Sequence, residues 1–277
     1  MMRMTETVKQ LLIINVIFYI GSNYVGDVAY QLFSLYYPEN IHFRAWQPLT
    51  SMFMHADVYT GKNSVGIMHI IFNMIGLISF GSALEHFWGA RKFLFFYISC
   101  GLGAALLHLG VSYYQIHSVL DQLSTLNLSE AEIKIILNAD YSTVFDSSGK
   151  MLAGQVRTIL ENANCTQDQF NTLTLAIQEF QTPSLGASGA IYGLLTAFAF
   201  MFPNAELMMM FIPVPIKAKY FVPGLLVVDL VLGFKGNSIF GSGGTGIAHF
   251  AHLGGALTGF IMMWYWKKNS FNNKRWD

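Results

Sequence analysis

Two long stretches without a charged side chain most constrain how this chain can fold. The first runs for 26 residues, from Phe180 to Ala205, and the second runs from Gly236 to Trp266. An α-helix needs about 20 apolar residues to cross the hydrocarbon region of a bilayer. Only 12% of the residues are charged, whereas soluble domains average about 25%. We therefore expect an integral membrane protein.

The apolar segments predict an all-α fold with six transmembrane helices. The expected spans are residues 8–26, 65–84, 93–115, 186–203, 220–235 and 247–266. No small-residue cleavage site follows the first apolar stretch, so we expect a retained helix rather than a cleaved signal. All six spans are expected to form one membrane domain covering residues 1–277.

The distribution of positive charge predicts an orientation. With six spans both termini share a side, and that side carries ten of the sixteen Lys and Arg residues. Because cytoplasmic loops carry an excess of Lys and Arg, we expect both termini in the cytoplasm of a cell-membrane protein. The zero net charge gives no electrostatic support for a nucleic-acid partner.

A polar segment, residues 116–183, separates the third span from the fourth. Its helix-like patterns lie near residues 129–138, 150–162 and 167–180, and Ser129 and Thr166 are typical of helix N-caps. The segment is too long for a plain connection. We therefore expect an extra helical insertion on the extracytoplasmic side.

A serine and a histidine stand in the two charge-free stretches. Serine becomes an effective nucleophile when a neighbouring base takes its proton. Ser188 directly follows the polar segment, and His252 lies about five residues into the last span. At 1.5 Å per residue, His252 is on the order of 8 Å deep. The similar depths predict a Ser–His dyad that opens to the extracytoplasmic side.

Glycines favour close contact between the helices that carry this pair. Small residues at helical spacing let backbones approach closely in lipid. The glycines on the expected contact faces are Gly186, Gly189 and Gly193 on the fourth span, and Gly255 and Gly259 on the sixth.

Further polar side chains are expected at the same depth. His69 and Asn73 share one face of the second span. With the Ser188 backbone N–H, they could donate hydrogen bonds to the oxyanion of a tetrahedral intermediate. Tyr192 lies one turn below Ser188 and could hold the ring of His252.

The sequence gives no clear third member of a catalytic triad. Asp229 is the only acid well within a span, and we expect it near the middle of the membrane, so a dyad fits better. His249 is expected to lie beside His252, supporting it or facing the pore.

Three motifs in this order resemble the rhomboid family of intramembrane serine proteases. They are HxxxN in the second span, GxSG at the start of the fourth and AHxxGxxxG in the sixth. In this chain they read His69-Ile70-Ile71-Phe72-Asn73, Gly186-Ala187-Ser188-Gly189, and Ala251-His252-Leu253-Gly254-Gly255-Ala256-Leu257-Thr258-Gly259. The resemblance covers essentially the whole chain apart from residues 116–183. At Trp46-Gln47-Pro48 the chain departs from many relatives, which have Trp-Arg there.

The resemblance implies a function. Ser188 would be the nucleophile, His252 the general base, His69 and Asn73 the oxyanion donors, and Tyr192 would stack on the base. The enzyme would be a multi-pass serine endopeptidase without a metal or cofactor. It would cleave transmembrane protein substrates near the outer surface of the lipid bilayer.

Three other interpretations remain open. A catalytically silent relative would bind transmembrane clients, although such relatives usually lack the serine or the histidine. A transporter would show repeat symmetry between its halves, and none is visible. A metal-dependent enzyme would need a carboxylate motif beside its histidines, which are His55, His69, His249 and His252.

Overall fold

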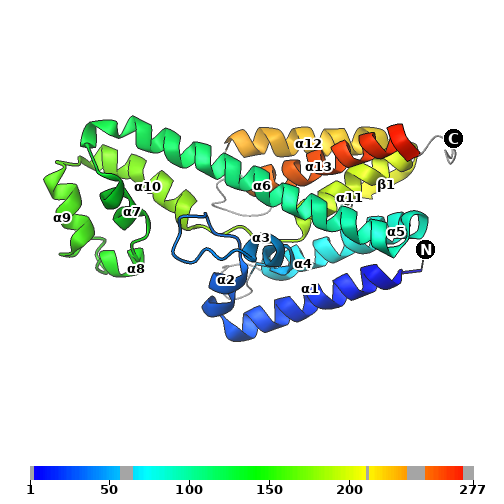
Figure 1. Cartoon of the computed structure of the whole chain (residues 1–277), viewed down its shortest axis with the longest axis horizontal. Helices are drawn as coiled ribbons and strands as arrows, with labels where there is room; N and C mark the ends of the chain where they lie inside the picture. The colour runs from blue at the N-terminus through cyan, green and yellow to red at the C-terminus, as the bar shows by residue number, and fades with distance from the viewer. Residues whose placement is uncertain (1–2, 57–64, 210–211, 236–246, 271–277) are drawn as a thin grey trace. The chain divides into compact units, whose positions relative to one another are not determined.

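The apolar segments form long helices in a computed structural model, which describes residues 3–56, 65–209, 212–235 and 247–270. The described residues are mostly helical and divide into two units (Figure 1). Unit 1 comprises Met1–Leu35, Ala45–His108 and Ser184–Asp277, and unit 2 comprises Tyr36–Arg44 and Leu109–Pro183.

Unit 1 contains the apolar helices. They are α1 (Glu6–Val25), α4 (Val65–Gly76), α5 (Ser82–Trp88), the first part of α6 (Ala90–Gln122), α11 (Ser188–Met201), α12 (Ala218–Lys235) and α13 (Ile247–Ser270). A π-helical turn, Leu77–Gly81, joins α4 to α5. Three segments of the described residues are long and apolar enough to cross a membrane, namely Glu6–Val25, Ile67–Trp88 and Ala90–Gln122.

The number of spans stays a prediction. The last three expected spans coincide with α11, α12 and α13 to within a few residues. Helix α11 is apolar, but it has only 14 residues. A helix of that length is about 21 Å long, shorter than a hydrocarbon core of about 30 Å.

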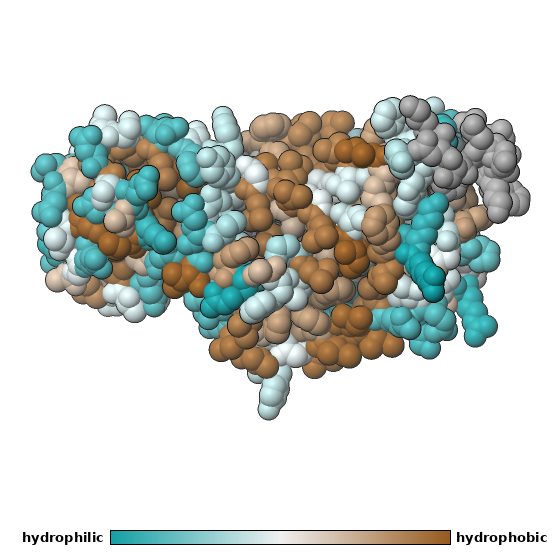
Figure 2. All heavy atoms as spheres, viewed as in Figure 1, coloured by the Kyte–Doolittle hydropathy of each residue, from teal (hydrophilic) through white to brown (hydrophobic). Residues whose placement is uncertain are grey.

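Large hydrophobic side chains remain exposed on the surface of unit 1. Figure 2 shows them gathered along its helices, with hydrophilic side chains near the start of α1. On α1, for example, the exposed side chains include Ile13, Ile14, Ile17 and Ile20. Contiguous exposed apolar surface of this kind is rare on soluble monomers and marks contact with a membrane or a partner. It agrees with helices that face lipid.

A buried carboxylate holds the start of α1. Glu85, on α5, accepts hydrogen bonds from the Thr5 hydroxyl and from the backbone N–H groups of Thr7 and Val8, the latter two at 3.1 Å each. The first N–H groups of a helix have no partner within the helix, and a negative charge there is favourable. Glu85 therefore attaches α1 to α5.

The first loop of unit 1 is anchored by side chains of Trp46 and Gln47. It contains α2 (Asp27–Phe33), α3 (Gln47–Thr50) and a 3₁₀ turn, Ser51–Phe53. The Trp46 indole donates to the Leu32 carbonyl oxygen, and the Gln47 amide donates to that of Gln31, both at 2.9 Å. Gln47 is fully buried. Glutamine thus ties α3 to the carbonyl groups of α2.

A small β-hairpin departs from the expected all-α fold. Strand β1 (Glu206–Met209) pairs antiparallel with β2 (Ile212–Lys217), between α11 and α12. The two prolines in the sequence of β2 exclude a helix there, since proline lacks an N–H and clashes with the preceding turn. The facing residues Glu206 and Lys217 also carry opposite charges, which favours the pairing.

Unit 2 forms a separate helical core. Besides the end of α6 it contains a 3₁₀ turn (Ser124–Leu126), α7 (Glu130–Leu137), α8 (Tyr141–Val144), α9 (Gln155–Asn162) and α10 (Gln167–Gln181). The expected N-caps Ser129 and Thr166 are confirmed, because each forms a reciprocal capping box with the third residue of its helix. The unit is larger than expected, beginning at Leu109 and including Tyr36–Arg44.

Candidate active site

The site depends on close packing of α11 against α13. A methyl group on Gly255 would overlap the carbonyl oxygen of Gly189, and one on Gly259 would lie 2.9 Å from the backbone of Gly193. These glycines are buried. The expected contact between the two helices is therefore present, and its backbones touch where any larger residue would force them apart.

The contact brings the serine and the histidine together. The Ser188 Oγ lies 2.9 Å from the His252 Nε2, within hydrogen-bonding distance. The Tyr192 ring stacks on the His252 ring, with centroids 4.2 Å apart and planes 9° from parallel. Ser188 is the first residue of α11, and Tyr192 follows one turn later. One helix thus presents both the hydroxyl and the ring that holds the imidazole.

Gly186 shapes the approach to Ser188. Its φ of +124° lies in a region that L side chains rarely adopt. A Cβ there would lie 3.2 Å from the His69 Nε2 and 3.5 Å from the Ser188 Oγ. Because Gly186 has no side chain, the space between the Ser188 hydroxyl and the His69 ring stays open.

The hydrogen bonding of His69 favours one tautomer. The Ala56 backbone N–H donates to the His69 Nδ1 at 3.3 Å. An imidazole nitrogen that accepts a hydrogen bond carries no proton, so in the neutral ring the proton is on Nε2. This nitrogen faces the space beside Gly186 and Ser188. His69 can therefore act as a hydrogen-bond donor in that space.

Asn73 is buried on the same helix as His69. Its Nδ2 donates to the carbonyl oxygen of His69 at 2.7 Å, and 5% of its surface is exposed. An amide nitrogen has two hydrogens to donate, so one remains after this bond. Asn73 is thus hydrogen-bonded to the backbone of His69, one turn earlier on the same helix.

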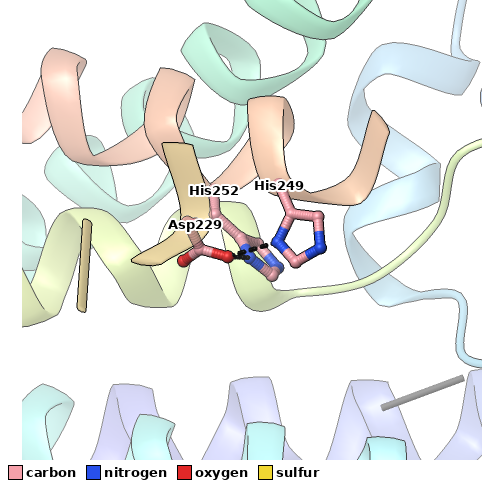
Figure 3. A group of neighbouring side chains, drawn as sticks. All are labelled: Asp229, His249 and His252. Atoms are coloured by element: carbon pink, nitrogen blue, oxygen red, sulfur yellow. Dashed lines mark hydrogen bonds and ion pairs between the residues drawn. The ribbon is translucent and has the colours of Figure 1, made fainter. Parts of the chain in front are cut away.

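An acid also lies at the site, contrary to the expectation from sequence. Asp229, on α12, places its Oδ1 2.5 Å from the His249 Nδ1 and 3.4 Å from the His252 Nδ1 (Figure 3). The carboxylate points between the two rings of α13, and it is 2% exposed. Sequence reasoning left Asp229 without a role, but the structure places it directly behind His252.

The same three side chains form a group of possible metal ligands among the described residues, with donor atoms within 4.8 Å of one another. Two ligands at about 2.1 Å from a tetrahedral zinc ion lie about 3.4 Å apart. The separation of 2.5 Å between His249 and Asp229 is shorter than that. The group therefore fits a hydrogen-bonded cluster better than a metal centre.

A small cavity adjoins Ser188. Its volume is about 40 Å³, and a water needs roughly 10–15 Å³ of such space. The residues around it come from the first loop, α6, the start of α11 and α13, and include Ser51, Ala104, Leu185, Gly186 and Ala251. Water-sized space is therefore present at the hydroxyl.

Comparison with known proteins identifies the family of the chain. The family model of the Rhomboid domain matches residues 42–119 and 141–269, which together are well over half of the chain. The chain belongs to the rhomboid family.

Three curated relatives share parts of the sequence. Rhomboid protein 1, mitochondrial, of Saccharomyces cerevisiae is 32% identical over 31% of this chain and 23% of its own length. RHOMBOID-like protein 12, mitochondrial, of Arabidopsis thaliana is 24% identical over 75% of this chain and 45% of its own length. An uncharacterized mitochondrial rhomboid protein of Schizosaccharomyces pombe is 24% identical over 82% of this chain and 53% of its own length. The chain thus spans about half or less of these relatives.

These relatives correct the expected location. The charge distribution suggested a cell-membrane protein with cytoplasmic termini and an extracytoplasmic site, whereas all three relatives are named as mitochondrial. The assignment to the cell membrane is therefore wrong. The positive-inside rule compares the two sides of a membrane, and it does not identify which membrane the protein occupies.

Proposed function

We propose that this chain is an intramembrane serine endopeptidase that cleaves transmembrane proteins. The observation that carries the proposal is the 2.9 Å contact between the Ser188 Oγ and the His252 Nε2. Polar groups inside a membrane are expensive and usually functional. A half-buried serine and imidazole within hydrogen-bonding distance form the nucleophile and base that acyl transfer requires. Six membrane spans, including α11, α12 and α13, complete the proposed architecture.

The catalytic steps follow from these contacts. His252 takes the proton of the Ser188 hydroxyl as its Oγ attacks the carbonyl carbon of the scissile peptide. The oxyanion that forms is stabilised by the His69 Nε2–H, the remaining Asn73 N–H and the Ser188 backbone N–H. His252 then gives its proton to the leaving amine. Water next hydrolyses the acyl-enzyme, again with His252 as the base.

The position of the site suggests where substrates are cut. Ser188 is the first residue of α11, so the proposed scissile bond lies near the membrane surface where that helix begins. The space beside Ser188 has room for the water that hydrolysis requires. A transmembrane substrate must expose an extended peptide bond, so helix-destabilising residues near the cut are expected to favour cleavage. No metal or cofactor is required.

Labelling with a fluorophosphonate probe tests the proposal. We expect the detergent-purified parent to be labelled, and Ser188→Ala and His252→Ala to remain unlabelled. Ser147→Ala is the control, because Ser147 is an exposed serine of unit 2 and lies outside the proposed site; it should be labelled like the parent. An unlabelled parent with a cooperative thermal unfolding transition would contradict an activated serine.

Cleavage of a fluorogenic transmembrane substrate in proteoliposomes tests the second half of the proposal. The parent should cleave, and Ser188→Ala should not. Labelling without cleavage of any transmembrane segment would leave a serine hydrolase and overturn the assignment of substrate class.

A further inference from the structure

A buried carboxylate lies behind the proposed base, on the opposite side of the ring from the nucleophile. The His252 ring faces Ser188 with its Nε2, at 2.9 Å, and Asp229 with its Nδ1, at 3.4 Å. We infer that Asp229 is a positioning residue that fixes the orientation and tautomer of His252, so that this chain works with a Ser–His–Asp triad. The inference deepens the proposed function and depends on it.

The tautomer argument follows from donor and acceptor roles. A carboxylate accepts hydrogen bonds, so the His252 Nδ1 must carry the proton that it donates to Asp229. In the neutral ring the Nε2 is then unprotonated, and it can accept the proton of Ser188. Without the acid, either ring nitrogen can hold the proton, and the tautomer with a protonated Nε2 cannot act as base. The carboxylate thus selects the reactive form.

Orientation is fixed from a second direction. Tyr192 stacks on one face of the imidazole, which restricts tilting of the ring, and Asp229 acts in the ring plane through Nδ1. The Tyr192 hydroxyl also approaches the carboxylate. A distance of 3.4 Å is long for a hydrogen bond. Catalytic hydrogen bonds are often long before substrate binds and shorten in the complex.

His249 makes a buried acid tolerable at this position. An isolated carboxylate in a low-dielectric interior is very costly unless it is paired and hydrogen-bonded. The His249 Nδ1 lies 2.5 Å from the same Oδ1 that faces His252. The described surroundings of Asp229 therefore supply two imidazoles, one that stabilises the acid and one that the acid orients.

A purely structural role makes a different prediction. If Asp229 only joined α12 to α13 through His249, removal of either residue would weaken the fold equally and leave turnover per folded molecule unchanged. If Asp229 orients His252, its loss affects turnover far more than the loss of His249. Comparison of Asp229→Asn with His249→Gln therefore separates the two roles.

Steady-state cleavage of a transmembrane substrate by the full chain is the first experiment. We expect Asp229→Asn to lower kcat on the order of 10³-fold, with KM changed less than about threefold. In chymotrypsin-type proteases, the same change at the buried aspartate costs about 10⁴-fold through the wrong tautomer. Asp229→Glu should recover part of the loss, and His249→Gln should lower kcat far less than Asp229→Asn does, because glutamine can still donate a hydrogen bond to the carboxylate.

Nitrogen-15 NMR of histidine-labelled protein is the second experiment, and it does not depend on activity. We expect the His252 resonances, assigned by loss in His252→Ala, to show a protonated Nδ1 in the parent and a larger share of protonated Nε2 in Asp229→Asn. Should Asp229→Asn fail to fold, the spectrum of the parent alone decides. A protonated Nε2 in the neutral parent overturns the proposal.

The outcomes separate this proposal from the proposed function. An inactive, unlabelled parent contradicts the protease itself. An active parent with Asp229→Asn of equal kcat contradicts only the triad. Equal losses of folded protein in Asp229→Asn and His249→Gln, with turnover per folded molecule unchanged, would assign the effect to the α12–α13 contact and would also overturn the positioning role.

Discussion

Two buried carboxylates of unit 1, Glu85 and Asp229, show how the partners of an acid determine its use. Both are almost fully buried, with 6% and 2% of their surfaces exposed. Glu85 accepts hydrogen bonds from a hydroxyl and from two backbone N–H groups at the start of α1. Asp229 instead faces two imidazoles of α13.

The difference lies in what the partners can do after the bond is made. Backbone N–H groups do not change protonation state, so the bonds of Glu85 only hold two helices together. An imidazole can accept and donate a proton during catalysis, so the bonds of Asp229 are coupled to proton transfer. We therefore expect changes at Glu85 to act on stability and changes around Asp229 to act on turnover.

The largest expected effect is at the base that Asp229 faces. His252→Ala should lower kcat about 10⁶-fold, as removal of a base does in a serine protease whose residues act as a unit, because the Ser188 proton has no acceptor. The measurement is single-turnover cleavage of a transmembrane substrate. The thermal unfolding midpoint should change little, and a collapse of the fold in this variant would contradict the separation of the two roles.

The oxyanion assignment is the next test. Asn73→Ala should lower kcat about 10²-fold, a typical cost for one lost donor in an oxyanion hole, with a smaller change in KM. Ser79→Ala, on an exposed position of the same helical segment, is the matched control and should retain the parent rate. If Asn73→Ala were as active as the parent, Asn73 would only hold the backbone of α4.

The structural acid gives the opposite pattern. Glu85→Gln keeps the shape and one carbonyl acceptor but removes the charge, and should lower the free energy of unfolding by about 1–3 kcal/mol, the cost of an unsatisfied buried hydrogen-bonding group. Thermal unfolding in detergent measures this loss. Glu6→Gln, at the exposed first turn of α1, is the control. Loss of kcat in folded Glu85→Gln would contradict a purely structural role.

The sequence predicts much of unit 1, because a lipid environment restricts which segments can form its helices. Charge-free length marks the helices, and glycine spacing marks the face where α11 meets α13. The Ser188–His252 contact follows from equal depth on those two helices and is present at 2.9 Å. These features depend on local patterns, which one sequence carries in full.

Asp229 could have been predicted by the same depth argument. It lies six residues before Lys235 at the end of α12, and His252 lies five residues after Ile247 at the start of α13. At 1.5 Å per residue these depths are about 9 Å and 8 Å. What the sequence could not supply is the rotation of α12 about its axis, because that helix is apolar on nearly every side and no single face marks the contact.

The β-hairpin and the boundaries of unit 2 were harder to predict from the sequence. Strands β1 and β2 are short and lie between two apolar helices, where the prolines of β2 are the main signal. Unit 2 recruits Tyr36–Arg44 from a loop far away in the sequence. The Asn40 side-chain amide donates to the Phe180 carbonyl oxygen at 3.0 Å. Hydrophobic periodicity does not predict a tertiary contact of this kind.

A third buried carboxylate, Glu179 on α10, gives the smallest and most discriminating test of how partners decide the role of an acid. It accepts a hydrogen bond from the Ser112 hydroxyl, and burial raises its pKa. A raised pKa in the folded state means that ionisation destabilises unit 2 above the unfolded-state pKa of about 4.3. Glu179→Gln should therefore raise the unfolding midpoint at neutral pH and leave it unchanged well below pH 4.

Glu132 is the matched opposite, since hydrogen bonds from Ser129 lower its pKa. Glu132→Gln should therefore lower the unfolding midpoint at neutral pH. A decrease with both substitutions would show that Glu179 is stabilised by its charge.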